Sequence, residues 1–179
     1  VKIPFIIKII KDKNSKGGKL NCGPPWDYDF TFGLTDYCDG WTTNSFVYNT
    51  FSKNCGSDSW QIPFFWEKLM SDPNFLFEVK KTYTFHRLKG GLQTSDLKNV
   101  VDSLKSELQV AQVRNFEKWN ILGKYIWPTK TYPSTWDGEV AEIMPWIESR
   151  LRWIDSKWLD PSLLGVITSN EVDKSFSIT

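Results

Sequence analysis

Two carboxylates stand two residues apart in the most aromatic stretch of the chain, GPPWDYDFTFG, residues 23–33. On an extended segment residues i and i+2 point to the same side, so Asp27 and Asp29 would present their oxygens together. Oxygen ligands of this kind suit a hard cation, Mg²⁺ or Ca²⁺, better than zinc. The flanking Gly23 and Gly33 would also let the backbone approach a phosphate closely.

The spacing of the two acids alone leaves a second interpretation open. Charged side chains are rarely buried without a partner, so the pair is either neutralised by a cation or open to water. An Asp-x-Asp pair in a turn is often solvated or serves as a capping device. No Lys or Arg lies between Lys19 and Lys53, so no basic neighbour in the sequence explains the pair.

Other catalytic arrangements have less support in the residues. His86 is the only histidine and falls near the end of an expected helix, where a cation is ordinary, so a Ser-His-Asp site is not favoured. The absence of a CxxC pair together with a single histidine makes a zinc site improbable. A glycosidase with two carboxylates suits the aromatic composition, but no spacing singles out a second acid.

The bulk composition bounds the class of protein. The 179 residues fit one domain. The 22 basic and 21 acidic side chains leave a net charge of +1, which does not indicate a nucleic-acid-binding protein. No apolar run approaches the roughly 20 residues that a membrane-spanning helix needs. The opening VKIPFIIKII is typical of a strand that begins abruptly, as in a piece of a longer chain. Ten tryptophans imply an aromatic core or a stacking surface, and their helical spacing favours the core.

The pattern predicts a short β-hairpin followed by a helical bundle, an α+β fold with helix dominant. The hairpin is expected from residues 3–10, with its tip at KDKNSKGGK. Helical periodicity is expected over four segments, residues 61–70, 72–88, 94–119 and 137–158.

Local signals set the ends of these helices. Asp72 would cap the second helix with Pro73 in its first turn, and Gly90 and Gly91 would end it. Pro145 lies inside the last segment and should kink or restart it. The apolar stripes of the last two segments are expected to form one helical core, with Trp119 and Trp146 nearby. Its members would be Leu104, Leu108, Ile147, Leu151 and Ile154.

Cys38 and Cys55 flank a polar, turn-rich loop. A bridge between them would stabilise the fold by about 3 kcal/mol through loop closure, and it would require an oxidising compartment. Two free buried thiols are the alternative.

Four ordered motifs resemble those of the spore coat protein H (CotH) kinase-like family. GPPWDYDFTFGLTDYCDGW resembles its metal-binding segment, and WQIPFFWEKLMSDPNFLFEVKKTY resembles the helices that follow. AQVRNFEKWNILGKYIWP and YPSTWDGEVAEIMPWIESRLRWIDSKW are similar to the end of the family domain. The resemblance covers about residues 5–160, so we expect residues 1–160 to be the C-terminal lobe of such a domain and residues 161–179 to be a tail.

The resemblance implies a secreted, atypical relative of protein kinases that uses ATP and a divalent metal, Mg²⁺ or Ca²⁺, to phosphorylate protein hydroxyls. By position Asp27 resembles the aspartate that holds Mg²⁺ over the phosphates, with Asp29 a second metal ligand or its support. A secreted or cell-surface or periplasmic location also favours the Cys38–Cys55 bridge and leaves Cys22 free.

No catalytic residue is expected within this chain. The nucleotide-holding lysine with its glutamate, the phosphate-covering loop and the catalytic Asp-Asn segment would all lie upstream of Val1 in this family. The expected partners are therefore the missing N-terminal lobe of the same protein and an unknown protein substrate. The alternative is a noncatalytic surface module that binds a protein or a glycan.

Overall fold

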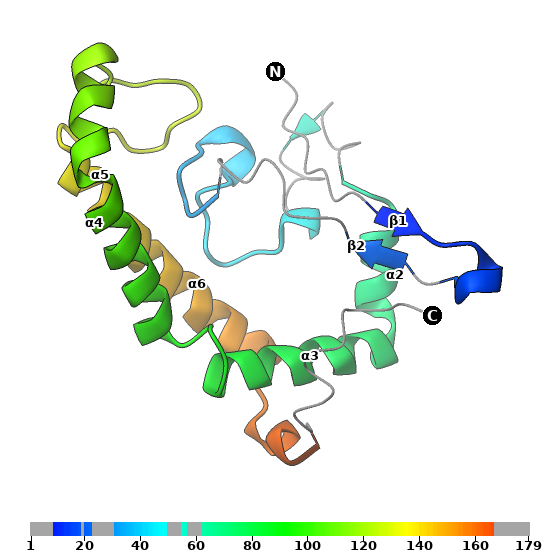
Figure 1. Ribbon diagram of the computed structural model, residues 1–179. Helices are drawn as coiled ribbons and strands as arrows, with labels where there is room; N and C mark the ends of the chain where they lie inside the picture. Colours follow the sequence, from blue (N-terminus) through cyan, green and yellow to red (C-terminus); the bar gives the residue numbers. More distant parts are fainter. Residues whose placement is uncertain (1–8, 19, 23–30, 50–54, 57–61, 167–179) are drawn as a thin grey trace.

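The computed structural model describes residues 9–18, 20–22, 31–49, 55–56 and 62–166 (Figure 1). Five α-helices dominate this part of the chain, and the mainly helical composition expected from the sequence is confirmed. Their bounds are α2 Phe65–Ser71, α3 Pro73–Leu88, α4 Thr94–Lys118, α5 Trp136–Ala141 and α6 Ile143–Trp158. Short 3-10 helices are η1 Asn14–Lys16, η2 Tyr37–Asp39 and η4 Pro161–Val166.

Among the described residues the only strands are β1, Ile9–Lys11, and β2, Leu20–Cys22. They pair antiparallel with Ile9 opposite Cys22. Gly17 follows η1 with φ of 97°, a left-handed conformation that glycine adopts without steric cost. In the view of Figure 1 this small sheet is drawn over α2, on the side of the molecule opposite α4.

The start and end of α3 follow from local sequence, as expected. The Asp72 carboxylate accepts hydrogen bonds from the backbone N–H groups of Asn74, at 2.8 Å, and Phe75, at 3.1 Å. These bonds satisfy two N–H groups that have no partner within the helix. Pro73 occupies the first helical position, and the helix ends at Leu88, before the two glycines.

The last helical segment is divided into α5 and α6, as Pro145 predicted. The Thr135 hydroxyl caps α5 by accepting from the Gly138 N–H at 3.0 Å. Helix α6 restarts at Ile143, which places Pro145 in its first turn, where no intrahelical N–H bond is lost.

Helices α3, α4 and α6 frame the molecule, and the segment 31–49 lies inside this frame (Figure 1). Helix α6 packs against both α3 and α5, whereas α4 is in contact with α5. The segment 31–49 reaches α6 through bonds from Arg150 to backbone carbonyls and through an edge-on contact of the Phe32 and Trp146 rings.

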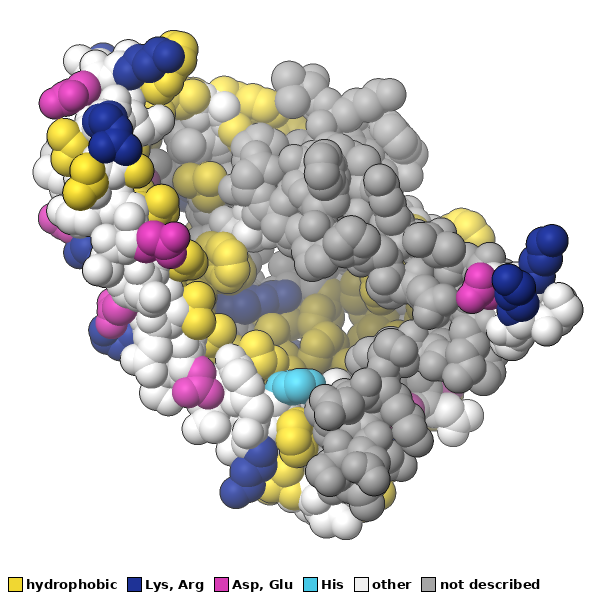
Figure 2. All heavy atoms as spheres, viewed as in Figure 1, with side chains coloured by type: hydrophobic (Ala, Val, Ile, Leu, Met, Phe, Trp, Pro, Cys, Tyr) yellow, Lys and Arg dark blue, Asp and Glu magenta, His cyan; other side chains and the backbone are white. Residues whose placement is uncertain are grey.

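The predicted core is correct for α6 and wrong for α4. Ile147 and Leu151 are each only 6% exposed, and Ile154 and Trp146 are partly buried. Leu104 is 51% exposed, Leu108 44% and Trp119 57%, so these three side chains do not join that core. Figure 2 shows apolar side chains along the length of α4 at the surface. The stripe on α4 is real, but no described element covers it.

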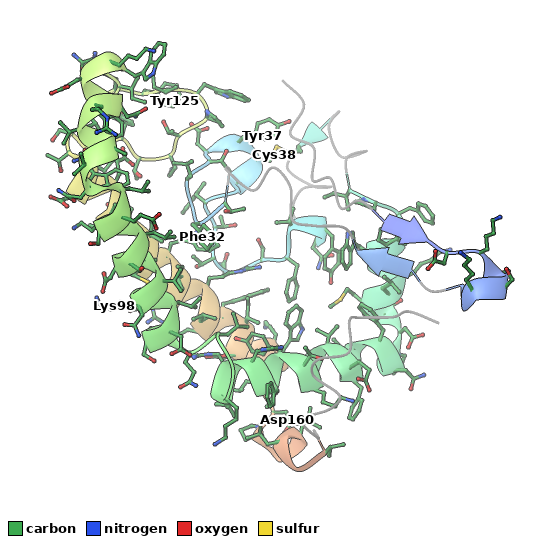
Figure 3. All side chains as sticks on the ribbon, viewed as in Figure 1. Phe32, Tyr37, Cys38, Lys98, Tyr125 and Asp160 are labelled. Atoms are coloured by element: carbon green, nitrogen blue, oxygen red, sulfur yellow. A yellow bond between two sulfur atoms is a disulfide. The ribbon has the colours of Figure 1, made fainter. Side chains whose placement is uncertain are left out.

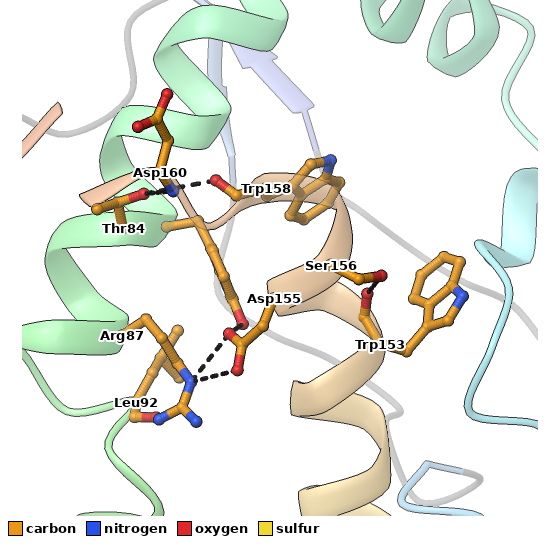
Figure 4. Close-up of polar contacts among 9 residues, drawn as sticks. Thr84, Arg87, Leu92, Trp153, Asp155, Ser156, Trp158 and Asp160 are labelled. Carbon is orange, nitrogen blue, oxygen red and sulfur yellow. Dashed lines mark hydrogen bonds and ion pairs between the residues drawn. The ribbon is translucent and has the colours of Figure 1, made fainter. Parts of the chain in front are cut away.

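A polar cluster joins α3 to α6 (Figure 4). Arg87 Nε donates to both carboxylate oxygens of Asp155, at 3.0 and 3.2 Å, and Tyr83 Oη donates to the same carboxylate at 2.6 Å. Burial and the Asp155 carboxylate raise the pKa of Tyr83 well above its usual range, so the phenol stays protonated as the donor.

A second contact holds the end of α6 on α3. Thr84, the only fully buried side chain among the described residues, donates to the Trp158 carbonyl at 3.4 Å. Its hydroxyl oxygen also accepts from the Asp160 N–H at 3.0 Å. One buried hydroxyl therefore satisfies two backbone groups where α6 ends (Figure 4).

Candidate functional site

Asp27 and Asp29 lie outside the described residues, so the structure does not test their predicted metal and cofactor roles. The described chain resumes at Thr31, two residues after Asp29. We call residues 31–43 the shoulder loop, because it is the part of the fold that directly follows the acidic motif. Its contacts with the rest of the molecule define the candidate site.

The shoulder loop begins with a turn that packs on Trp146 of α6. Phe32 and Gly33 both have positive φ, 54° and 82°. A methyl group on Gly33 would overlap the Trp146 ring, so glycine is required both for its backbone conformation and for its lack of a side chain. The Phe32 ring meets the Trp146 ring edge-on, with centroids 6.0 Å apart.

Trp146 also holds the backbone near the end of the shoulder loop, at Trp41. Trp146 Nε1 donates a 2.7 Å hydrogen bond to the Trp41 carbonyl. From the sequence, Gly33 was expected to let the backbone approach a phosphate closely. The structure instead places an indole against this glycine, a contact that spacing along the chain could not reveal.

The middle of the shoulder loop is held by the connection between α4 and α5. The Asp36 N–H donates to the Pro128 carbonyl at 2.7 Å, and the Lys130 N–H donates to the Leu34 carbonyl at 2.6 Å. Tyr125 Oη donates to the Asp36 carboxylate at 3.2 Å. Thr35, between these contacts, is only 5% exposed. The loop is thus tied to a segment about 90 residues away in sequence.

A disulfide joins Cys38 and Cys55, with Cα atoms 5.2 Å apart, which confirms the predicted pairing (Figure 3). Cys38 lies in η2 with φ of 53°. The bridge therefore attaches the shoulder loop covalently to residue 55. The side chain of Cys22 lies outside the described part of the structure, so its expected free thiol stays a prediction.

Arg150 of α6 supports the end of the shoulder loop and the residues just after it. Its Nη1 donates to the carbonyls of Thr43, at 2.9 Å, and of Ser45. The guanidinium also lies 4.9 Å from the centroid of the Trp153 ring and 5.8 Å from that of Phe46. Burial lowers the pKa of Arg150, and carbonyl acceptors with aromatic faces take the place of water around the cation.

A pocket of about 450 Å³ opens between the shoulder loop, residues 130–131, α5 and α6. Four aromatic side chains form much of its wall, together with three charged ones. The aromatic residues are Phe32, Trp41, Trp136 and Trp146, and the charged residues are Lys130, Glu139 and Glu142. This pocket could not be predicted from the sequence, because its walls come from four separate segments.

The charges of the pocket are arranged around the aromatic walls. Lys130 Nζ lies 4.4 Å from the centroid of the Trp41 ring, a cation–π contact. Burial, and then the nearby charge of Glu142, raise the pKa of the Glu139 carboxyl. The indole N–H of Trp136 is buried, and no group in the described ranges accepts it.

A donor set for a metal is not found in the described ranges, where no three His, Cys, Asp or Glu side chains converge on one point. The metal-ligand prediction therefore continues to rest on Asp27 and Asp29 and their motif. The shoulder loop, which follows this motif in the sequence, has a backbone held by Trp146, by the Pro128 carbonyl and by the Cys38–Cys55 bridge.

Comparison with known proteins agrees with the motifs. The family model described as CotH kinase protein matches residues 8–154, which include the acidic motif, the shoulder loop, the pocket and most of α6. No curated protein and no solved structure matches the chain. The match covers well over half of the 179 residues, and the chain belongs to the CotH kinase protein family.

Proposed function

We propose that residues 1–160 form the C-terminal lobe of a kinase-like protein that transfers a phosphoryl group from ATP to protein hydroxyls. The observation that carries this proposal is the family match over residues 8–154, which includes the Asp-x-Asp motif. The metal would be Mg²⁺ or Ca²⁺, since both take carboxylate oxygens.

Within this proposal Asp27 holds the metal, and Asp29 is a second ligand or orients the first. A bound divalent ion would neutralise the charge of the ATP phosphates, which is where most catalysis of phosphoryl transfer arises. The residues that follow the motif support this fit. Gly33 packs on Trp146, and the Asp36 N–H is bonded to the Pro128 carbonyl, so the backbone after the acids has little freedom to move.

The remaining parts of the machinery are assigned to an N-terminal lobe. A kinase also needs a lysine that contacts the phosphates, a glutamate that pairs with it, a covering loop and a catalytic Asp-Asn segment. We assign these parts to sequence upstream of Val1 and no catalytic residue to this chain. The C-terminal lobe then contributes the metal ligands and the surface next to them.

The proposed location is outside the cytosol, by secretion, at the cell surface or in the periplasm. The Cys38–Cys55 disulfide supports an oxidising compartment, because such bridges are rare where thiols are kept reduced. No helix in the described ranges is long and apolar enough to cross a membrane.

The test is phosphoryl transfer by the full-length protein. Wild type, Asp27→Ala and the control Asp102→Ala are incubated with Mg²⁺ and ATP labelled on the γ-phosphate, with casein as a generic acceptor and the protein itself as a second. We expect transfer by wild type and the control, and a loss of at least about a hundredfold in Asp27→Ala. A folded wild type that transfers no phosphate would reject the kinase proposal and favour the noncatalytic binding module.

A further inference from the structure

Aromatic and charged side chains line the pocket between the shoulder loop and the α5–α6 pair, and they point to a second ligand. We propose that this pocket binds a neutral sugar residue of a glycan. This inference goes beyond phosphoryl transfer, because it assigns the pocket a ligand other than ATP and its metal. It rests on three properties of the walls, which are their aromatic faces, their balance of charges and their unused hydrogen-bonding groups.

The aromatic walls suit the apolar face of a sugar ring. Phe32 is 55% exposed and Trp41 42% exposed, although large aromatic side chains gain free energy from burial. Exposed apolar side chains gathered around one hollow are typical of a binding site. Trp146 is already fixed by its bond to the Trp41 carbonyl, so little side-chain entropy remains to be lost when a ring packs between these walls.

The charges in the pocket favour a neutral ligand over a charged one. Glu139 and Glu142 would repel an anion, and no ion pair to either carboxyl is present within the described ranges. Lys130 already lies on the Trp41 ring, so a cationic ligand would meet a like charge there. Hydroxyl groups avoid both conflicts, because one hydroxyl can donate to a carboxylate or accept from an ammonium group.

The unused polar groups match the edge of a sugar. Two carboxylates can accept hydroxyl protons, and the Lys130 ammonium can donate to a ring or hydroxyl oxygen. Trp136 also lines the pocket, and its buried indole N–H has no acceptor among the described residues. The volume of about 450 Å³ is within the range of small-molecule sites, about 300–1,000 Å³.

The test is calorimetric and NMR titration of the 179-residue chain with defined sugars. The neutral probes are maltose, cellobiose and diacetylchitobiose. The charged probes are glucuronic acid and a lysine tripeptide. We expect at least one neutral disaccharide to bind in the millimolar range, and both charged probes to bind at least about tenfold more weakly.

Two variants and one control locate the binding. Trp41→Ala should weaken binding of the disaccharide at least about tenfold, because it removes an aromatic wall. Glu142→Gln changes an exposed side chain without disturbing the fold, and it should weaken binding severalfold. Trp119→Ala, an exposed tryptophan beyond the end of α4, should leave binding unchanged.

The proposal fails if wild type binds none of the three disaccharides, or if the lysine tripeptide binds more tightly than all of them. It also fails if binding survives both Trp41→Ala and Glu142→Gln. Sugar binding needs neither ATP nor metal, so a chain that binds sugar but transfers no phosphate would refute the proposed kinase function alone.

Discussion

Helices α4 and α6 carry the same kind of apolar stripe, yet the structure buries only one of them. Ile147 and Leu151 on α6 are each 6% exposed, whereas Leu104 and Leu108 on α4 are 51% and 44% exposed. Both stripes have the spacing of an amphipathic helix. The periodicity therefore identifies the apolar face of a helix, and a separate contact decides whether that face is covered.

Helix α6 packs against α3, whereas the main contact of α4 is with α5. Asp155 accepts from Tyr83 and Arg87 of α3, and these bonds hold the buried face of α6 in place. Helix α4 is joined to α5 by the Lys105–Asp137 ion pair, at 2.7 Å, a contact exposed to solvent. The candidate site depends on the same difference, because Trp146 and Arg150, which hold the shoulder loop, are both on α6.

The largest expected effect comes from truncating one leucine on each helix. Leu151→Ala should lower the free energy of unfolding by about 2–5 kcal/mol, since it leaves a cavity in the core. Leu108→Ala, the matched change on α4, should cost less than about 1 kcal/mol. Urea denaturation of the two variants measures both values. Equal losses would mean that α4 is buried in solution and would remove the contrast between the helices.

The next effect comes from removing one aspartate from each helix. Asp155→Ala leaves Tyr83 Oη and the Arg87 guanidinium without their acceptor in a half-buried position, and should cost about 1–3 kcal/mol. Asp102→Ala removes the exposed Lys98–Asp102 pair of α4, and should cost less than about 0.5 kcal/mol. Thermal and urea unfolding would compare them. A loss below about 0.5 kcal/mol for Asp155→Ala would show that the polar cluster does not hold α6.

A third comparison replaces one glycine by alanine in each of two places, the shoulder loop beside α6 and the turn before α4. Gly33→Ala forces a side chain into a left-handed conformation and against the Trp146 ring, and should cost about 1–3 kcal/mol. Gly91→Ala places its methyl group in open space, and should change stability by less than about 0.5 kcal/mol. Near-ultraviolet circular dichroism should show an altered tryptophan environment in Gly33→Ala alone. Unchanged spectra in both variants would argue against the Gly33–Trp146 contact.

The smallest expected effect is a dependence on pH. Burial raises the pKa of Glu139 in the folded state above its ordinary 4.5, so folding favours the protonated carboxyl. Its contribution to stability is greatest below pH 4.5 and is lost as the pH rises through the higher folded-state pKa. Glu139→Gln should therefore stabilise the chain slightly at neutral pH, and this gain should disappear in acid.

The control for this pH dependence is Glu107→Gln, an exposed glutamate on α4. Melting temperatures measured from neutral to acidic pH should show no comparable trend for this variant. A Glu139→Gln gain that stays constant down to acidic pH would contradict the assigned pKa direction.

Features set by neighbouring residues could be predicted from the sequence. Asp72 and Pro73 start α3 through bonds that span three residues, and Pro145 acts through its own missing N–H. The Cys38–Cys55 pairing was also predicted, since the two residues flank one loop and the motifs resemble those of secreted proteins.

Features that depend on distant partners could not be predicted in the same way. The exposure of Leu104 and Leu108 depends on which element lies beside α4, and no local pattern contains that information. The pocket likewise brings Trp41 together with Lys130 and Glu139, which lie far from it in the sequence. Of the candidate site, the motif was identified from the sequence by resemblance, while the packing of the loop after it required the structure.

The measurement that tests the central claim most directly is calorimetric titration of Mg²⁺ and ATP into the full-length protein and its Asp27→Ala variant, with a melting curve for each without ligand. If Asp27 is a metal ligand beside a loop that α6 holds in place, the variant should lose binding of the metal–nucleotide complex. Its melting temperature should stay equal or rise slightly, because Asp29 loses a like-charged neighbour. Equal binding in both proteins would contradict the metal role. A large fall in the melting temperature of the variant would show that Asp27 is structural.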